Sequence, residues 1–207
     1  MDFDGTLVES NNIKDRAFET IFCEWPEHTE TMMSWHIAHN STERGEKFRY
    51  FVEEVLELSE QKDLIENLIA RFRELTKTAI VECPFVMGAE EFLEYFSNRI
   101  VVYLVSATPQ LDLDHIIKAR GLGGYFKDVY GAPVQKDETL KNIILLEKVS
   151  VDEILFIGDS SEDQQSAKNI GINFIGMQSD RKLVKTENNI FSDFLRIKKY
   201  TEENYAL

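Results

Sequence analysis

The chain has 207 residues, which fits one large domain or one domain that carries a sizeable insert. Apolar residues make up 43% and charged residues 29%, a composition typical of folded globular proteins that excludes disorder and fibrous repeats. The 23 Lys and Arg against 37 Asp and Glu give a formal net charge of −14, which argues against nucleic acids and anionic membrane surfaces as partners. An anionic substrate would need a local positive charge, from a few basic side chains or from a bound cation.

The sequence lacks the features of a membrane span and of a secretory leader. Its longest apolar run, residues 100–105, is far shorter than the ~20 residues that cross a bilayer, and the N-terminal Met-Asp-Phe-Asp has no basic n-region. Cys23 and Cys83 lie in unrelated contexts without a CxxC spacing, so we expect two core thiols and neither a disulfide nor a zinc site. The sequence predicts a cytoplasmic protein, and it leaves the oligomeric state open between a monomer and a weak dimer.

Residues 11–81 have the pattern of an all-helical block. They contain one glycine, Gly45, and few β-branched runs. Apolar residues recur there at helical spacing, as in Leu64, Leu68, Phe72 and Leu75. The block interrupts a chain of different character, so we expect an inserted helical cap at 11–81 and a core domain formed by residues 1–10 and 82–207.

From Gly88 onward, short apolar runs alternate with amphipathic stretches, which is the pattern of a parallel sheet covered by helices. A helix is expected over residues 89–96, and the β-branched run at 100–105 suits a strand buried on both faces. Thr108 and Pro109 then read as the N-cap and first residue of the next helix, which ends at a glycine.

The same alternation continues to residue 177. Strands are expected near 126–130, at 154–158 and near 173–177, with a helix around 140–144 between the first two. The fold class is therefore α/β, a Rossmann-like, doubly wound and mainly parallel sheet. In such sheets the ligand site lies at the carboxyl ends of the strands.

Four polar motifs occupy these strand ends or strand-like turns. In chain order they are DFDGT at 2–6, SATP at 106–109, GAPVQK at 131–136 and GDSSED at 158–163. Each has a simple structural explanation when taken alone, such as a turn at Asp4-Gly5 or a capping box between Ser160 and Asp163. Together, and in this order, they supply what phosphoryl transfer through an enzyme carboxylate requires.

This set of motifs resembles the haloacid dehalogenase superfamily, and the resemblance covers essentially the whole chain. DFDGT with GDSSED at this separation carries most of it, while SATP and GAPVQK add support. A helical insert after the first motif is similar to one of the family's cap placements, as in enzymes like phosphoglycolate phosphatase and beta-phosphoglucomutase. The resemblance implies a Mg²⁺-dependent enzyme that acts on a small phosphorylated metabolite.

The resemblance also implies roles for the acidic residues. Asp2 would be the nucleophile that forms an aspartyl-phosphate, and Asp4 the acid and base that protonates the leaving oxygen and later activates water. Asp2, the carbonyl of Asp4 and Asp159 would hold Mg²⁺, whose charge lets a carboxylate attack an anion. Asp163 would complete the metal site by orienting Lys136 or a metal-bound water.

Three groups would bind the remaining phosphoryl oxygens. These are the Ser106 hydroxyl, the amide near Ala107 and the Lys136 ammonium, which would stabilise the charge that spreads over the transferring group. In the cap, Arg44 and Lys47 would contact the distal part of the substrate, and Lys14 follows the first motif closely enough to do the same. A solvated basic pair at Arg44 and Lys47 is the simpler alternative.

Three other functions remain open. Dehalogenases of the family lack an acid at the position of Asp4, and mutases acting on β-glucose 1-phosphate carry a histidine at the position that aligns with Lys14. Both differences favour a phosphatase over a dehalogenase or a phosphomutase. A catalytically silent binding module stays open because only Met1 precedes the nucleophile, where the family has an apolar central strand. We therefore expect the natural functional protein to begin several residues earlier with an apolar run.

Overall fold

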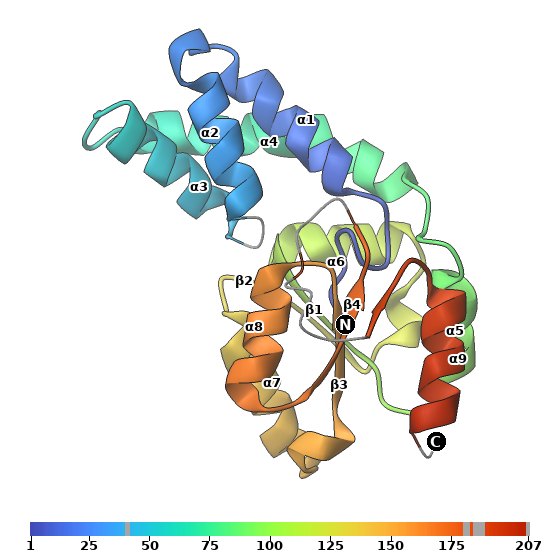
Figure 1. Cartoon of the computed structure of the whole chain (residues 1–207). Helices are drawn as coiled ribbons and strands as arrows, with labels where there is room; N and C mark the ends of the chain where they lie inside the picture. Colours follow the sequence, from blue (N-terminus) through green and yellow to red (C-terminus); the bar gives the residue numbers. More distant parts are fainter. Residues whose placement is uncertain (40–41, 180–182, 184–188, 206–207) are drawn as a thin grey trace. The chain divides into compact units, whose positions relative to one another are not determined.

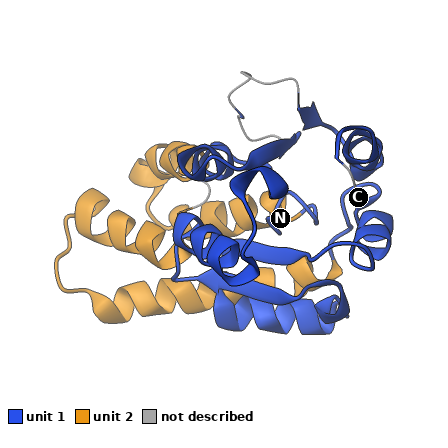
Figure 2. Ribbon diagram, turned by 90° about the horizontal axis from the view of Figure 1, so that it is seen from below, with its two compact units in different colours: residues 1–9, 83–207 blue, residues 10–82 orange. Residues whose placement is uncertain are grey.

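The chain, described by a computed structural model over residues 1–39, 42–179, 183 and 189–205, divides into two units. One unit consists of residues 1–9 and 83–207, and the other of residues 10–82 (Figure 2). Among the described helices, none combines the length and the apolar composition that a bilayer span requires.

The first unit contains the strands β1 to β5, and the pairings between these strands are parallel. β1 (Tyr103–Pro109) pairs with β2 (Asp128–Ala132). β3 (Leu155–Gly158) pairs with β4 (Asn173–Met177), and β4 pairs with the short β5 (Ile190–Phe191). The predicted α/β class with parallel strands is confirmed, with β2 beginning two residues later than expected.

The first two residues lie between β1 and β3 and hydrogen-bond to both. The Met1 nitrogen donates to the Tyr103 carbonyl at 2.8 Å, and the Met1 carbonyl accepts from the Val105 amide at 2.9 Å. These two bonds flank one residue of β1, as in a parallel pair. On the other side, the Asp2 amide donates to the Ile157 carbonyl at 2.8 Å. Asp2 therefore sits between the two sheets, close to the end of β3.

Helices cover the strands of this unit. They are α5 (Ala89–Phe96), α6 (Gln110–Ala119), α7 (Lys136–Glu147), α8 (Ser161–Ile170) and α9 (Phe194–Asn204). Single 3₁₀ turns, Gly123–Tyr125 and Val151–Glu153, precede β2 and β3. In Figure 1, α7 and α8 lie on one side of the strands, and α5 with α9 on the other. Side chains of β1, β3, α7 and α8 form a shared apolar core, which includes Tyr103, Val105, Leu140, Ile143, Phe156 and Ala167.

The strand predicted at residues 100–105 begins three residues later than expected. Ile100 and Val101 are 41% and 54% exposed, and the Ile100 amide donates to the Phe96 carbonyl at the end of α5. Ile100 and Val101, at the start of the run, therefore belong to the segment that follows α5. The pairing of β1 with β2 begins at Tyr103. Composition alone does not separate these two uses, because the run is continuous.

The helix predicted to start at Thr108 and Pro109 starts instead at Gln110. Thr108 and Pro109 belong to β1, and Pro109 pairs with Ala132 of β2 across a register shift. The N-cap residue is Pro109, and the Thr108 hydroxyl donates to Asp4 Oδ2. The predicted end of this helix is confirmed, because Gly121 follows it with φ of 69°.

The second unit is helical in its described part. It contains α1 (Asn11–Phe22), α2 (Pro26–Ala38), α3 (Arg44–Tyr50), the π-helical segment Phe51–Val55 and α4 (Lys62–Glu82). Its core is rich in aromatic residues, with Phe18, Phe22, Phe48, Phe51 and Phe72 buried together. Leu64, Leu68 and Phe72 contribute to this core as the spacing predicted, whereas Leu75 is exposed.

The cysteines differ from the expectation in one respect. Both are free, but Cys23 is exposed at the end of α1 and only Cys83 is buried. Burial raises the pKa of the Cys83 thiol. The expectation that both are core thiols is therefore wrong for Cys23.

Candidate active site

Lys136 lies between two buried carboxylates. As the first residue of α7, it places its Nζ 2.9 Å from Asp2 Oδ1 and 2.5 Å from Asp163 Oδ1. Burial, together with the neighbouring carboxylates, raises the pKa of Asp2 to about 7, against the opposing effect of Lys136. Burial lowers the pKa of Lys136, but Asp163 and Asp2 outweigh it and hold that pKa above its usual range. One cation is therefore shared by at least two buried acids.

Asp163 serves two partners, one with each carboxylate oxygen. Oδ1 binds Lys136, while Oδ2 accepts from the amide and the hydroxyl of Ser160 at 3.2 and 2.7 Å. The Asp163 amide in turn donates to Ser160 Oγ, which completes the predicted capping box at the start of α8. Gly158 permits this packing, since a Cβ there would lie 2.6 Å from the Asp163 side chain. Asp163 thus completes the predicted capping box and also contacts Lys136, and its role in a metal site stays a prediction.

The acidic side chains converge where a cation fits. Asp2, Asp159 and Asp163 are buried, and each offers an oxygen within 4.8 Å of those of the other two. Oxygen-only donor sets of this kind suit Mg²⁺. Three buried carboxylates exceed the single positive charge of Lys136, so a bound divalent ion would balance the cluster.

Asp4 lies in the turn that follows Asp2, and its carboxylate points to the end of β1. The turn depends on Gly5, whose φ is 72° and whose amide donates to the Val8 carbonyl at 2.9 Å. Asp4 Oδ2 accepts from Thr108 Oγ1 at 2.8 Å and lies 3.5 Å from Ser106 Oγ. The structure thus brings together the first two motifs, as their positions at strand ends predict.

Ser106 and Ala107 lie in the second half of β1. Ser106 is buried and accepts from the Thr108 amide at 3.1 Å, while Ala107 is half-buried. Thr108 was missed as a site residue because Thr-Pro also signals a helix start. The available signal was the two-residue period of a strand, which places residues 106 and 108 on one face.

Residues 1–177 match the family described as haloacid dehalogenase-like hydrolase. The chain belongs to this family. The predicted family and its hydrolase class are thereby confirmed. No curated protein matches the sequence at a significant level.

Solved structures share the fold of this hydrolase over nearly its whole length. A predicted phosphoglycolate phosphatase from Haemophilus somnus 129PT has a TM-score of 0.77 at 17% identity, covering 97% of this chain and 95% of that one. CbbY from Rhodobacter sphaeroides in complex with phosphate has a TM-score of 0.74 at 15% identity, covering 95% of this chain and 93% of that one. YfnB from Bacillus subtilis bound to magnesium has a TM-score of 0.71 at 16% identity, covering 97% of this chain and 96% of that one. At these identities the likeness establishes the fold.

The predicted cap residues of this hydrolase have different environments. Arg44 begins α3, and its guanidinium lies 5.8 Å from the centre of the Phe72 ring. Lys14 is half-buried near the start of α1. Lys47 is only 2% exposed, so the alternative of a solvated basic pair is wrong for this residue. Contact of the three with substrate stays a prediction.

Lys47 belongs to a buried polar chain that links three helices. Its Nζ lies 2.9 Å from His36 Nδ1, and His36 Nε2 lies 2.8 Å from Asp15 Oδ1. The Phe18 ring packs on both, 4.2 Å from the His36 ring centre and 5.3 Å from Lys47 Nζ. A lysine in such a place is stable only with its partners present.

We expect Lys47→Met to lower the free energy of unfolding by ~3 kcal/mol, because it removes a cation from beside the buried His36, which is paired with the half-buried Asp15. Denaturant titration would measure the loss. Lys62→Met, which removes an exposed lysine at the start of α4, is the control and should change the value by less than about 0.5 kcal/mol. Equal effects of the two substitutions would contradict a stabilising role for Lys47.

We expect Lys136→Met to lower kcat/KM for a phosphate monoester by about 10²- to 10³-fold, because it removes the cation beside Asp2. Lys141→Met, an exposed lysine on the same helix, should keep the wild-type value. Steady-state phosphate release measures both. Activity of Lys136→Met within threefold of the wild type would exclude Lys136 from the site.

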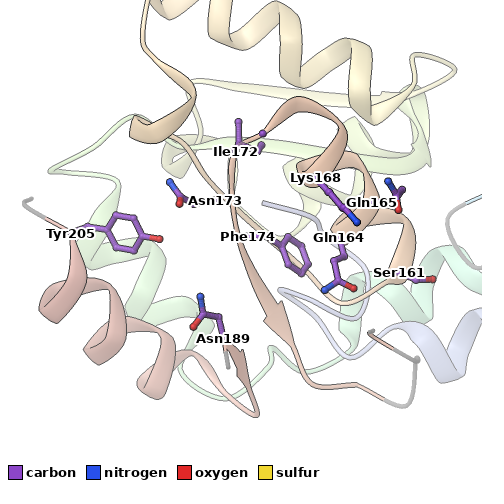
Figure 3. Close-up of a pocket in the computed structure, with 10 residues that line it drawn as sticks. Ser161, Gln164, Gln165, Lys168, Ile172, Asn173, Phe174, Asn189 and Tyr205 are labelled. Carbon is purple, nitrogen blue, oxygen red and sulfur yellow. The ribbon is translucent and has the colours of Figure 1, made fainter. Parts of the chain in front are cut away.

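A separate cavity of about 450 Å³ opens in the same unit beside α8 and β4 (Figure 3). Its lining is mainly polar amide and aromatic side chains, including Gln164, Asn173, Phe174, Asn189 and Tyr205. The residues described as lining it include none of the predicted site residues.

Proposed function

We propose that this protein is a Mg²⁺-dependent phosphatase that hydrolyses a phosphate monoester of a small metabolite through an aspartyl-phosphate on Asp2. The observation that carries the proposal is the position of Asp2, held 2.9 Å from Lys136 among further buried carboxylates. Membership of a hydrolase family supports it. Asp4, two residues further on, supplies a second carboxylate in the same turn.

In the proposed first step, an oxygen of the Asp2 carboxylate forms a bond to phosphorus. The bond from phosphorus to the leaving oxygen breaks, and that oxygen keeps the electron pair and takes the proton held by Asp4. Lys136, Ser106 and the amide near Ala107 hold the other phosphoryl oxygens. Their donors stabilise the charge on the transferring group before water enters.

In the second step, a water molecule attacks the phosphorus of the aspartyl-phosphate and gives its proton to Asp4. The bond between Asp2 and phosphorus breaks, its electron pair returns to the carboxylate, and inorganic phosphate leaves. Asp4 is again protonated for the next turnover, so the two steps balance. The same carboxyl thus works as acid and then as base.

Asp2, Asp159 and the carbonyl of Asp4 would hold Mg²⁺, with Asp163 beside them. The ion supplies positive charge against which an anionic carboxylate approaches an anionic phosphate. The convergence of three carboxylates within 4.8 Å supports this assignment.

We further propose that the helical unit, residues 10–82, is a cap that selects the substrate, and that residues 1–9 with 83–207 form the catalytic core. Arg44 is the cap cation best suited to a distal anionic group, since an arginine fork matches phosphate or carboxylate geometry. The substrate class is then a sugar phosphate or a phosphoglycolate-like acid. The name of the similar Haemophilus structure agrees with this class.

Phosphate release from p-nitrophenyl phosphate, a panel of sugar phosphates and phosphoglycolate, with and without Mg²⁺, tests the proposal. A phosphatase releases inorganic phosphate from at least one substrate, and only with the metal. A phosphomutase would isomerise a sugar phosphate in the presence of a bisphosphate and release little phosphate. Absence of both reactions in folded protein would favour a silent binding module and overturn the proposal.

A further inference from the structure

Thr108 connects the proposed acid and base with the phosphate-binding end of β1. Its hydroxyl donates to Asp4 Oδ2 at 2.8 Å, and its amide donates to Ser106 Oγ at 3.1 Å. Thr108 and Asp4 are 6% and 9% exposed, so solvent competes little for this hydrogen bond. One residue thus contacts two predicted site residues that come from different parts of the chain.

The backbone of Thr108 is held independently of the turn that carries Asp4. A residue before proline is restricted to extended conformations, and Pro109 follows directly. Glycine at 131 lets β2 pack against it, since a Cβ there would lie 2.5 Å from the Thr108 carbonyl oxygen. A β-branched side chain also has few χ1 rotamers. The hydroxyl is therefore a fixed point toward which the Asp4 carboxyl turns.

We propose that Thr108 is the positioning residue of Asp4, fixing the orientation of its carboxyl for proton transfer to the leaving oxygen. This inference rests on the proposed phosphatase function. A carboxyl on a turn can rotate about its terminal torsion, which is broad. Proton transfer requires the donor to lie within hydrogen-bond distance of the leaving oxygen. A carboxyl held in one orientation has this geometry in a larger fraction of its conformations.

The dependence on leaving group tests this role. Nitrophenolate departs without a proton, whereas a sugar alkoxide needs one, so only the sugar phosphate depends on the acid. We expect Thr108→Val to lower kcat/KM for the best sugar phosphate of the panel by about 10- to 100-fold, a part of what a general acid contributes. For p-nitrophenyl phosphate, kcat/KM of the same variant should fall by less than about threefold. This parameter reports the steps up to aspartyl-phosphate formation and so excludes the second step.

Three further variants complete the experiment. Asp4→Asn should show the same selectivity with a larger loss. Thr108→Ser, which keeps the hydroxyl, should recover most of the sugar phosphate activity. Thr201→Val removes another buried hydroxyl of the same unit, bonded to the Ile197 carbonyl, and should leave both substrates unaffected. Thermal melting of each variant accompanies the kinetics.

Each outcome decides the inference. A selective loss for the sugar phosphate in Thr108→Val, recovered in Thr108→Ser, supports it. Equal losses for both substrates, or no loss, show that Thr108 is merely structural or dispensable and overturn it. If the wild-type protein hydrolyses neither substrate, the proposed function itself fails. This outcome differs from a failure of the Thr108 inference, because it is seen in the wild type and not only in the variants.

Discussion

Asp2→Asn is expected to reduce phosphate release from every substrate by at least about 10⁴-fold. The carboxylate oxygen that forms the bond to phosphorus is replaced by an amide of the same shape, so the loss reflects chemistry and not packing. The amide also keeps a carbonyl oxygen near Lys136 Nζ, which lies 2.9 Å from Asp2 Oδ1 in the wild type. Uncatalysed monoester hydrolysis is extremely slow, so little background rate can hide the effect.

The control for this substitution is Glu91→Gln, which removes an exposed carboxylate on α5 and should keep the wild-type rate. Melting curves of the three proteins separate inactivity from misfolding. Retention of more than a tenth of the wild-type kcat by folded Asp2→Asn would show that another group attacks phosphorus.

Removal of Mg²⁺ is the second change with a large expected effect. Chelation should abolish phosphate release, and added Mg²⁺ should restore it. Binding to the folded state alone should also stabilise the protein, by about 2.7 kcal/mol at 100 times the dissociation constant. For a chain of this length that corresponds to a rise in Tm of about 5–10 °C. The melting shift is measured without substrate, so it tests the site separately from the reaction.

Asp159→Asn should lose most of this Mg²⁺-induced shift, because it removes one of the three converging carboxylates. Without metal, it should melt no lower than the wild type, since one negative charge leaves a cluster that Lys136 alone does not balance. Asp152→Asn, an exposed residue of the 3₁₀ turn before β3, should keep the wild-type shift. A full Mg²⁺ shift in Asp159→Asn would place the ion elsewhere.

The meeting of the acidic residues with Lys136 follows from the sequence by a simple rule. Parallel strands end at one edge of the sheet, so the motifs that follow them come together there. Asp2, Asp159 and Asp163 meet at this edge, although more than 150 residues separate the first from the others. The motif order and the strand pattern were sufficient, because each motif directly follows a strand or a strand-like turn.

The environments of Thr108 and Lys47 could not be predicted from the sequence, for different physical reasons. Thr108 stands in a Thr-Pro pair that serves equally well at the start of a helix and at the end of a strand, and the pairing with β2 decides between them. Lys47 is buried because His36 and Asp15 lie on two other helices and meet it there. Such contacts depend on helix packing, and no local pattern encodes them. The same applies to residues 100 and 101, whose exposure is decided by the end of α5.

The most direct test of the account is a rapid-quench search for the covalent intermediate. Enzyme and Mg²⁺ are mixed with a ³²P-labelled substrate from the panel, quenched in acid within the first turnover, and the labelled peptide is identified by mass spectrometry. We expect an acid-stable, hydroxylamine-sensitive label on the peptide that contains Asp2, formed before free phosphate and absent from Asp2→Asn. Phosphate that appears in the first turnover without any labelled enzyme, or a label on another residue, would contradict it.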